Sequence, residues 1–92
     1  MKVLFTDDGW ADCASWVDEN NRRMLRRINR LIADIQRDDA GDGIGKPELL
    51  SGSLSGWASR RIDEEHRLIY RIREETLQIG RASCRERVFG YV

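Results

Sequence analysis

Hydrophobic residues recur with helical spacing along the first 37 positions of the chain. A short run typical of a β-strand, KVLF at 2–5, comes first, and Thr6 or Asp7 then offers a helix N-cap. Between 8 and 19 the apolar residues fall at i, i+3, i+4, i+6 and i+7, which predicts an amphipathic helix. Residues 22–37 have the cleanest helical period, with apolar side chains on one face and arginines on the other. Asn20 and Asn21 separate the two helical segments and indicate a tight turn between them. A strand followed by two antiparallel helices is therefore predicted.

The second half of the chain alternates between polar linkers and short apolar runs. Residues 38–56 carry five glycines, one proline and three serines, and we predict a long loop there. Runs of strand length at 56–62, 66–72 and 76–82 predict an antiparallel meander. In the middle run one face carries His66, Leu68, Tyr70 and Ile72, and the other carries Arg67, Ile69 and Arg71. The predicted fold is α+β, β-α-α-β-β-β, with the helical pair on one face of an antiparallel sheet and arginines on the open face.

Composition indicates a single compact domain. The chain has 92 residues, of which 40% are hydrophobic and 35% are charged, with one proline, and this balance argues against disorder. No apolar run approaches the 18 or so residues of a membrane span, and the apolar start is too short for a signal peptide. The two cysteines, Cys13 and Cys84, give no disulfide framework. We therefore expect a cytoplasmic protein without membrane contact.

The formal net charge of zero hides a strong segregation of charge. Residues 7–19 contain five acidic side chains and no basic one, whereas 22–37 contain six arginines and one aspartate. Fourteen of the sixteen basic residues are arginine, whose planar guanidinium binds phosphates through paired hydrogen bonds. A dipolar, solvated surface would show the same pattern, so charge alone does not identify a nucleic-acid partner.

Several chemistries lack the residues that they need. One histidine and two distant cysteines cannot build a metal site, and GDGIGKPE lacks the spacing of a phosphate-binding P-loop. What remains is a loop carboxylate, Glu48, with arginines at 60, 61 and 67. Such a set suits phosphodiester cleavage, in which the carboxylate removes a proton and guanidiniums stabilise charge on phosphorus. The alternative is that Glu48 is an ordinary surface residue and the arginines solubilise an exposed sheet.

Three ordered motifs carry a family resemblance. GKPELL, LSGWASRRIDEEHRLIYRI and LQI resemble the YoeB/Txe family of toxins in the wider RelE-like group, and the similarity covers about residues 1–79. The resemblance implies a toxin of a type II toxin–antitoxin system that cleaves mRNA on the ribosome by 2′-hydroxyl attack, with no cofactor or metal. Its implied partners are a cognate antitoxin, the ribosome with mRNA, and a second copy of the chain.

The resemblance also implies roles for individual residues. Glu48, after KP, matches the general base, and Arg67, after EEH, matches the arginine that braces the scissile phosphate. Arg61 matches a second arginine that contacts RNA, and Lys46 and Arg60 are expected to bind RNA or phosphate as well. Further candidates, with less defined roles, are Glu65 and His66; we interpret His66 as structural rather than substrate-binding, and Trp57 and Tyr70 as sheet core rather than base-stacking platforms.

The end of the chain departs from the family pattern. The family ends in a histidine, its general acid, and a tyrosine. In register from Leu77 those positions hold Arg85 and Glu86, and an alignment with a gap matches Tyr91 but puts Gly90 at the histidine. IGRASCRERV resembles a translated sequencing adapter, so we divide the chain into a toxin domain, 1–80, and an atypical tail, 81–92, that is either foreign to the gene or a divergent natural end. Impaired catalysis is expected. Two alternatives remain: an inactive homologue that only binds antitoxin, and a gyrase inhibitor like ParE.

Overall fold

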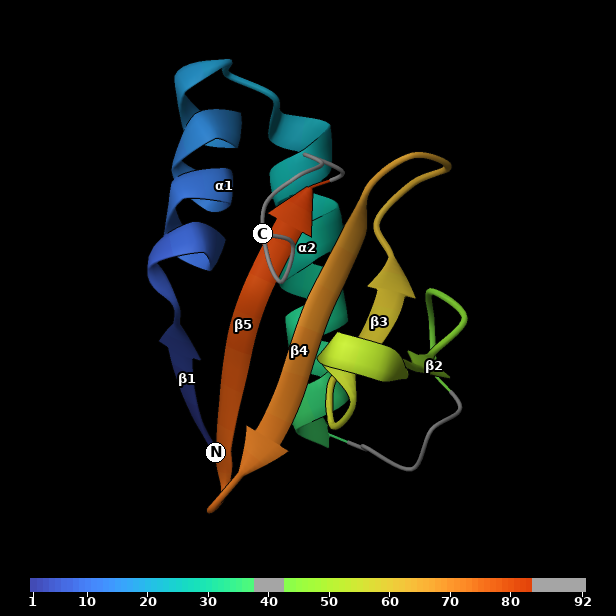
Figure 1. Cartoon of the computed structure of the whole chain (residues 1–92). Coiled ribbons are helices and arrows are strands. Elements are labelled where there is room, and N and C mark those ends of the chain that lie inside the picture. The colour runs from blue at the N-terminus through green and yellow to red at the C-terminus, as the bar shows by residue number, and fades with distance from the viewer. Residues whose placement is uncertain (38–42, 84–92) are drawn as a thin grey trace.

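A five-stranded sheet with two helices on one face forms the fold (Figure 1). The computed structural model describes residues 1–37 and 43–83. The helices are α1 (Asp7–Asp18) and α2 (Arg22–Arg37), and the strands are β1 (Lys2–Phe5), β2 (Glu48–Leu49), β3 (Ala58–Arg61), β4 (Arg67–Arg73) and β5 (Thr76–Ser83). The strand order is β1-β5-β4-β3-β2. The α+β class, the helical pair and the predicted meander are confirmed.

Two short elements lie within the segment predicted as a loop. β2 pairs antiparallel with β3, and a 3-10 turn, η1 (Gly52–Leu54), follows it. A two-residue strand is too short to show alternation, so the glycine-rich composition hid it. The first strand also adds a feature that the pattern did not contain, because β1 pairs parallel with β5 and makes the sheet mixed.

Local polar contacts set the ends of both helices. Thr6 caps α1, since its hydroxyl oxygen accepts a hydrogen bond from the Gly9 N–H at 3.0 Å. Asn20 has a left-handed backbone, with φ of 56°, and ends the first helix. The Asn21 side chain then accepts from the Met24 N–H at 3.2 Å and caps α2. The predicted break at this pair of asparagines is confirmed.

The core lies between the helices and one face of the sheet. Leu31 and Ile35 of α2 and Leu68 of β4 are fully buried, and Tyr70 is 4% exposed. The predicted inward face of the middle strand is therefore confirmed at Leu68 and Tyr70. No helix within residues 1–37 or 43–83 is long and apolar enough to cross a membrane.

α1 covers the edge of β5 that β1 leaves open. β1 ends opposite Ile79, and beyond it the Asp12 carboxylate accepts from the Ala82 N–H at 2.9 Å while the Trp16 indole donates to the Ala82 carbonyl at 2.8 Å. Arg81 is buried and pairs with Asp12 at 2.7 Å. β5 thus continues to Ser83, three residues past the boundary predicted at 80. The rest of the predicted tail, 84–92, lies outside the described residues.

Candidate functional site

The two residues predicted to be catalytic meet on the open face of the sheet. Arg67 Nη1 lies 3.2 Å from Glu48 Oε1, and the two side chains are 41% and 60% exposed. Arg67 also donates to the Ser59 hydroxyl at 3.2 Å. Glu48 and Arg67 come from β2 and β4, with β3 between them, and Glu48 is paired with Ser59 in the strand register. The result is a solvent-accessible carboxylate beside a guanidinium that Ser59 orients.

Arg61 lies on the same face, directly opposite Arg67 in the register of β3 and β4. It is exposed, so two arginines are paired across β3 and β4 on the face that carries the carboxylate. Lys46 is exposed two residues before Glu48, with a left-handed backbone of φ 53°. These two predicted RNA contacts are therefore available to solvent near the Glu48–Arg67 pair.

Arg60 does not lie at this surface, and its predicted contact with RNA needs correction. It pairs with Leu68, which places it on the helix side of the sheet, and its side chain is completely buried. Its guanidinium donates to Asp34 at 2.6 Å, to the Tyr70 hydroxyl at 3.1 Å and to the Ile44 carbonyl at 3.2 Å. A buried arginine with these partners cannot reach RNA in this structure.

The buried arginine instead anchors the segment that leads to Glu48. The Ile44 carbonyl accepts from Arg60, and the Ile44 N–H donates to Asp34 at 3.3 Å. The next carbonyl, of Gly45, accepts from the Arg61 N–H at 2.6 Å. Gly45 has φ of 85°, and a side chain there would press on Leu31 and on the β3 backbone. Arg60 is thus a positioning residue for the chain that carries the carboxylate.

Electrostatics stabilise the charged forms of this buried pair. The hydrogen bond from Arg60, which outweighs the opposing effect of burial, holds the pKa of Asp34 below its ordinary value. Burial alone would lower the pKa of Arg60, but its hydrogen bonds to Tyr70 and Asp34 raise it above the ordinary value. Both groups are therefore charged at neutral pH.

The β3–β4 turn places the other two candidates. The Asp63 carboxylate accepts from the backbone N–H groups of Glu65 and His66 at 2.8 and 2.7 Å. Burial would raise the pKa of Asp63, but these hydrogen bonds lower it, and the net result is a pKa below the ordinary value. Glu65 is exposed in this turn, whereas the half-buried His66 ring packs edge-on against Trp16, with ring centroids 4.8 Å apart. This contact supports the structural interpretation of His66.

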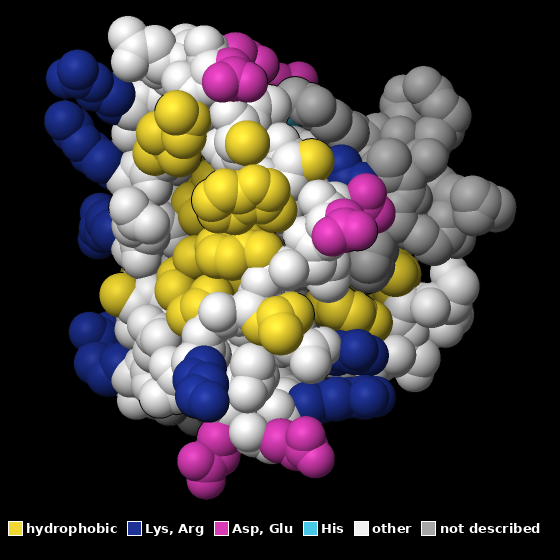
Figure 2. All heavy atoms as spheres, turned by 90° about the vertical axis from the view of Figure 1, so that its left-hand side faces the viewer, with side chains coloured by type: hydrophobic (Ala, Val, Ile, Leu, Met, Phe, Trp, Pro, Cys, Tyr) yellow, Lys and Arg dark blue, Asp and Glu magenta, His cyan; other side chains and the backbone are white. Residues whose placement is uncertain are grey.

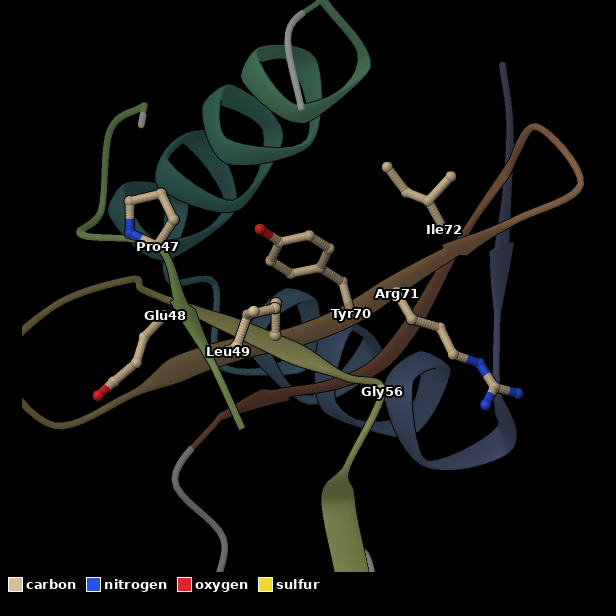
Figure 3. Close-up of a pocket in the computed structure, with 8 residues that line it drawn as sticks. Pro47, Glu48, Leu49, Gly56, Tyr70, Arg71 and Ile72 are labelled. Atoms are coloured by element: carbon tan, nitrogen blue, oxygen red, sulfur yellow. The ribbon is translucent and has the colours of Figure 1, made fainter. Parts of the chain in front are cut away.

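A hollow of about 380 Å³ lies beside Glu48 (Figure 3). Its lining includes Pro47, Leu49, Ala58, Tyr70 and Ile72, and Glu48 and Arg71 also border it. In the close-up, Tyr70 and Ile72 point toward α2, whereas Glu48 and Arg71 point away from it. The carboxylate therefore stands between an apolar hollow and the arginine-bearing open face.

Sequence reasoning missed the role of Ser59. Its hydroxyl accepts a hydrogen bond from Arg67. That role would follow from the pairing of Ser59 with Glu48, but this pairing is known only once β2 has been located. Trp57 also differs from its interpretation as core, because it is half-buried under the guanidinium of Arg71. In the segments that the structure describes, no group of three or more His, Cys, Asp or Glu residues could hold a metal ion.

Comparison with known proteins identifies the family of the chain. A sequence model of the family described as "YoeB-like toxin of bacterial type II toxin-antitoxin system" matches residues 5–87. The chain belongs to this family. Toxin YoeB of Streptomyces coelicolor is 51% identical over 82 residues, which cover 89% of this chain and 95% of that protein.

Solved YoeB structures have the same fold. The YoeB–YefM complex from Staphylococcus aureus matches with a TM-score of 0.83 at 36% identity, over 90% of this chain and 94% of that one. The YoeB dimer from the same organism matches with a TM-score of 0.82 at 35% identity, over the same shares, 90% and 94%. The RelE-like architecture predicted for this toxin is thereby confirmed.

Proposed function

We propose that this YoeB-like toxin is a ribosome-dependent mRNA endonuclease that acts in the cytoplasm, where mRNA is translated. The observation that supports this most is the exposed Glu48–Arg67 pair, 3.2 Å apart, with Arg61 beside it. A carboxylate next to two guanidiniums has the charges that a phosphodiester cleavage needs.

In this mechanism Glu48 takes the proton of a ribose 2′-hydroxyl, and the 2′-oxygen attacks the neighbouring phosphorus. Arg67 and Arg61 stabilise the negative charge on the non-bridging oxygens. The bond from phosphorus to the 5′-oxygen then breaks, the 5′-oxygen takes up a proton from water, and the products carry a 2′,3′-cyclic phosphate and a 5′-hydroxyl. An entering phosphate replaces Glu48 as the partner of Arg67, which frees the carboxylate to act as base.

Primer extension on ribosome-bound mRNA tests the proposal. Glu48→Gln keeps the size of the side chain but removes the base, and we expect cleavage to fall by about 10²–10⁴-fold. Glu75→Gln is the matched control, because Glu75 is an exposed carboxylate in the β4–β5 turn, and it should cleave normally. Equal cleavage by both variants would contradict the proposal. Gyrase-dependent DNA damage with intact mRNA would instead favour the ParE-like alternative.

Antitoxin binding is the second part of the proposal, and α1 offers a surface for it (Figure 2). Trp10 and Val17 are 62% and 60% exposed, and with Leu25 of α2 they line an apolar groove of about 300 Å³. Figure 2 shows this apolar patch with basic side chains along one border. Exposed arginines 22 and 26 flank Leu25 on α2. A partner segment that is apolar on one side and acidic on the other fits this surface.

Titration with the antitoxin encoded beside the toxin tests this surface. Trp10→Ser should weaken the complex at least tenfold, because it removes the largest exposed apolar side chain in the groove. Leu49→Ser, which alters an exposed apolar residue on β2, should bind normally. If Trp10→Ser changes the oligomeric state of the free toxin but not its affinity for antitoxin, the groove is a contact between two copies of the toxin. The proposed antitoxin surface is then wrong.

A further inference from the structure

Arg71 forms a second ordered arginine site on the open face. Its guanidinium carbon lies 4.3 Å from the centre of the Trp57 ring, and its Nε donates to Gln78 Oε1 at 2.6 Å. Gln78 is its partner in the register of β4 and β5. The guanidinium is therefore fixed by a stacking contact below and a hydrogen bond at Nε.

The terminal nitrogens of this guanidinium remain available. Within residues 1–37 and 43–83, no hydrogen bond or ion pair involves Arg71 Nη1 or Nη2. An arginine loses much side-chain entropy when it binds a ligand, and here the stack on Trp57 and the bond to Gln78 have already removed part of it. Two parallel N–H groups on an ordered guanidinium match the oxygens of a phosphate.

The position of Arg71 ties it to the proposed cleavage site. It stands four residues after Arg67 on the same face of β4, which corresponds to about 13 Å along the strand. A few nucleotides of extended single-stranded RNA span this distance. Glu48 and Arg71 also border the same hollow, so a strand with its cleaved linkage at Glu48 would pass this guanidinium (Figure 3).

We propose that Arg71, held by Trp57 and Gln78, binds a backbone phosphate of the RNA strand beside the cleaved linkage. This inference rests on the proposed function and assigns a second phosphate subsite to it. Trp57 holds the guanidinium over its ring, and Gln78 holds it at Nε. The alternative is that Arg71 only shields the Trp57 ring from water.

Binding of a fluorescent single-stranded RNA oligonucleotide to full-length Glu48→Gln protein tests the subsite without cleavage. In that background Arg71→Met should lower the affinity about tenfold or more and reduce the slope of log K against log salt by about 0.7. Arg71→Lys keeps the charge, so it should preserve the slope and still lose affinity. Arg30→Met removes an exposed arginine from α2 and should change affinity less than twofold.

A scan with single neutral methylphosphonate linkages locates the phosphate. At one linkage, neutralisation should weaken binding to the Arg71 protein but not to the Arg71→Met protein. Additive effects at every linkage, equal losses for Arg71→Met and Arg30→Met, or no binding at low salt would each overturn the subsite. The proposed cleavage is judged separately by primer extension, so either idea can fail while the other stands.

Discussion

Two adjacent arginines, Arg60 and Arg61, should respond in opposite ways to the same substitution. Arg60 is completely buried and donates to Asp34, Tyr70 and Ile44, whereas Arg61 is exposed on the open face. We expect Arg60→Met to lower stability and Arg61→Met to lower RNA affinity. The pair provides its own control, because each substitution removes one guanidinium and one positive charge from neighbouring positions of one strand.

The size of the stability loss follows from the contacts. Removing one partner of a buried ion pair costs about 3–5 kcal/mol, because the other charge stays buried. Asp34 keeps a second partner, Arg37, at 2.6 Å, but that side chain is 75% exposed. We therefore expect the lower end of the range, about 3 kcal/mol, which lowers the melting temperature of a domain of this size by roughly 12–24 °C. Arg61→Met should change the free energy of unfolding by less than about 0.5 kcal/mol.

Thermal and urea unfolding, followed by circular dichroism in a Glu48→Gln background, measure this difference. The same samples report RNA affinity, and there Arg61→Met should reduce the salt slope by about 0.7. Arg60→Met combined with Asp34→Asn should regain part of the lost stability, because it removes the unpaired carboxylate. Melting temperatures for Arg60→Met and Arg61→Met within a few degrees of each other would refute the assignment of Arg60 to the core.

Three further predictions concern pH, thiol chemistry and the tail. Folding lowers the pKa of Asp34, so its contribution to stability is fully present above the unfolded pKa, about 3.9, and is lost as pH falls through the folded pKa. The urea concentration at the midpoint of unfolding should therefore drop in acid. It should drop less for Asp34→Asn. Burial raises the pKa of Cys13 to about 11. In a Cys84→Ser protein, iodoacetamide should therefore modify Cys13 about a hundredfold more slowly in the folded state than in the urea-unfolded state. Equal rates in the two states would contradict this. Replacing Arg85 with His and Glu86 with Tyr should raise mRNA cleavage by about 10²–10⁴-fold, and growth arrest of equal strength at matched expression would show that the general acid lies elsewhere.

The helices and the meander were predictable because each carries a clear period. Buried residues recur every three or four positions along the sixteen residues of α2, and Leu68 and Tyr70 are buried at alternate positions of β4, so a one-residue error would expose the core. The position of Glu48 was less accessible to such reasoning. It depends on the two residues of β2 and on the anchoring of Ile44 and Gly45, and these contacts connect segments far apart in the sequence.

Alternation along β3 decides which of the two arginines lies on the exposed face of the sheet. Successive residues of a strand point to opposite faces, so a resemblance that matches both letters of SRRI cannot give both the same role. One signal in the sequence did mark the buried member: Asp34 follows Leu31 and precedes Ile35 on the apolar face of α2. A carboxylate at such a position needs a charged or hydrogen-bonding partner, and a basic residue on the helix side of the sheet can supply a buried one. The candidate surface therefore depends on a buried arginine, because Arg60 fixes the segment that presents Glu48 to Arg67.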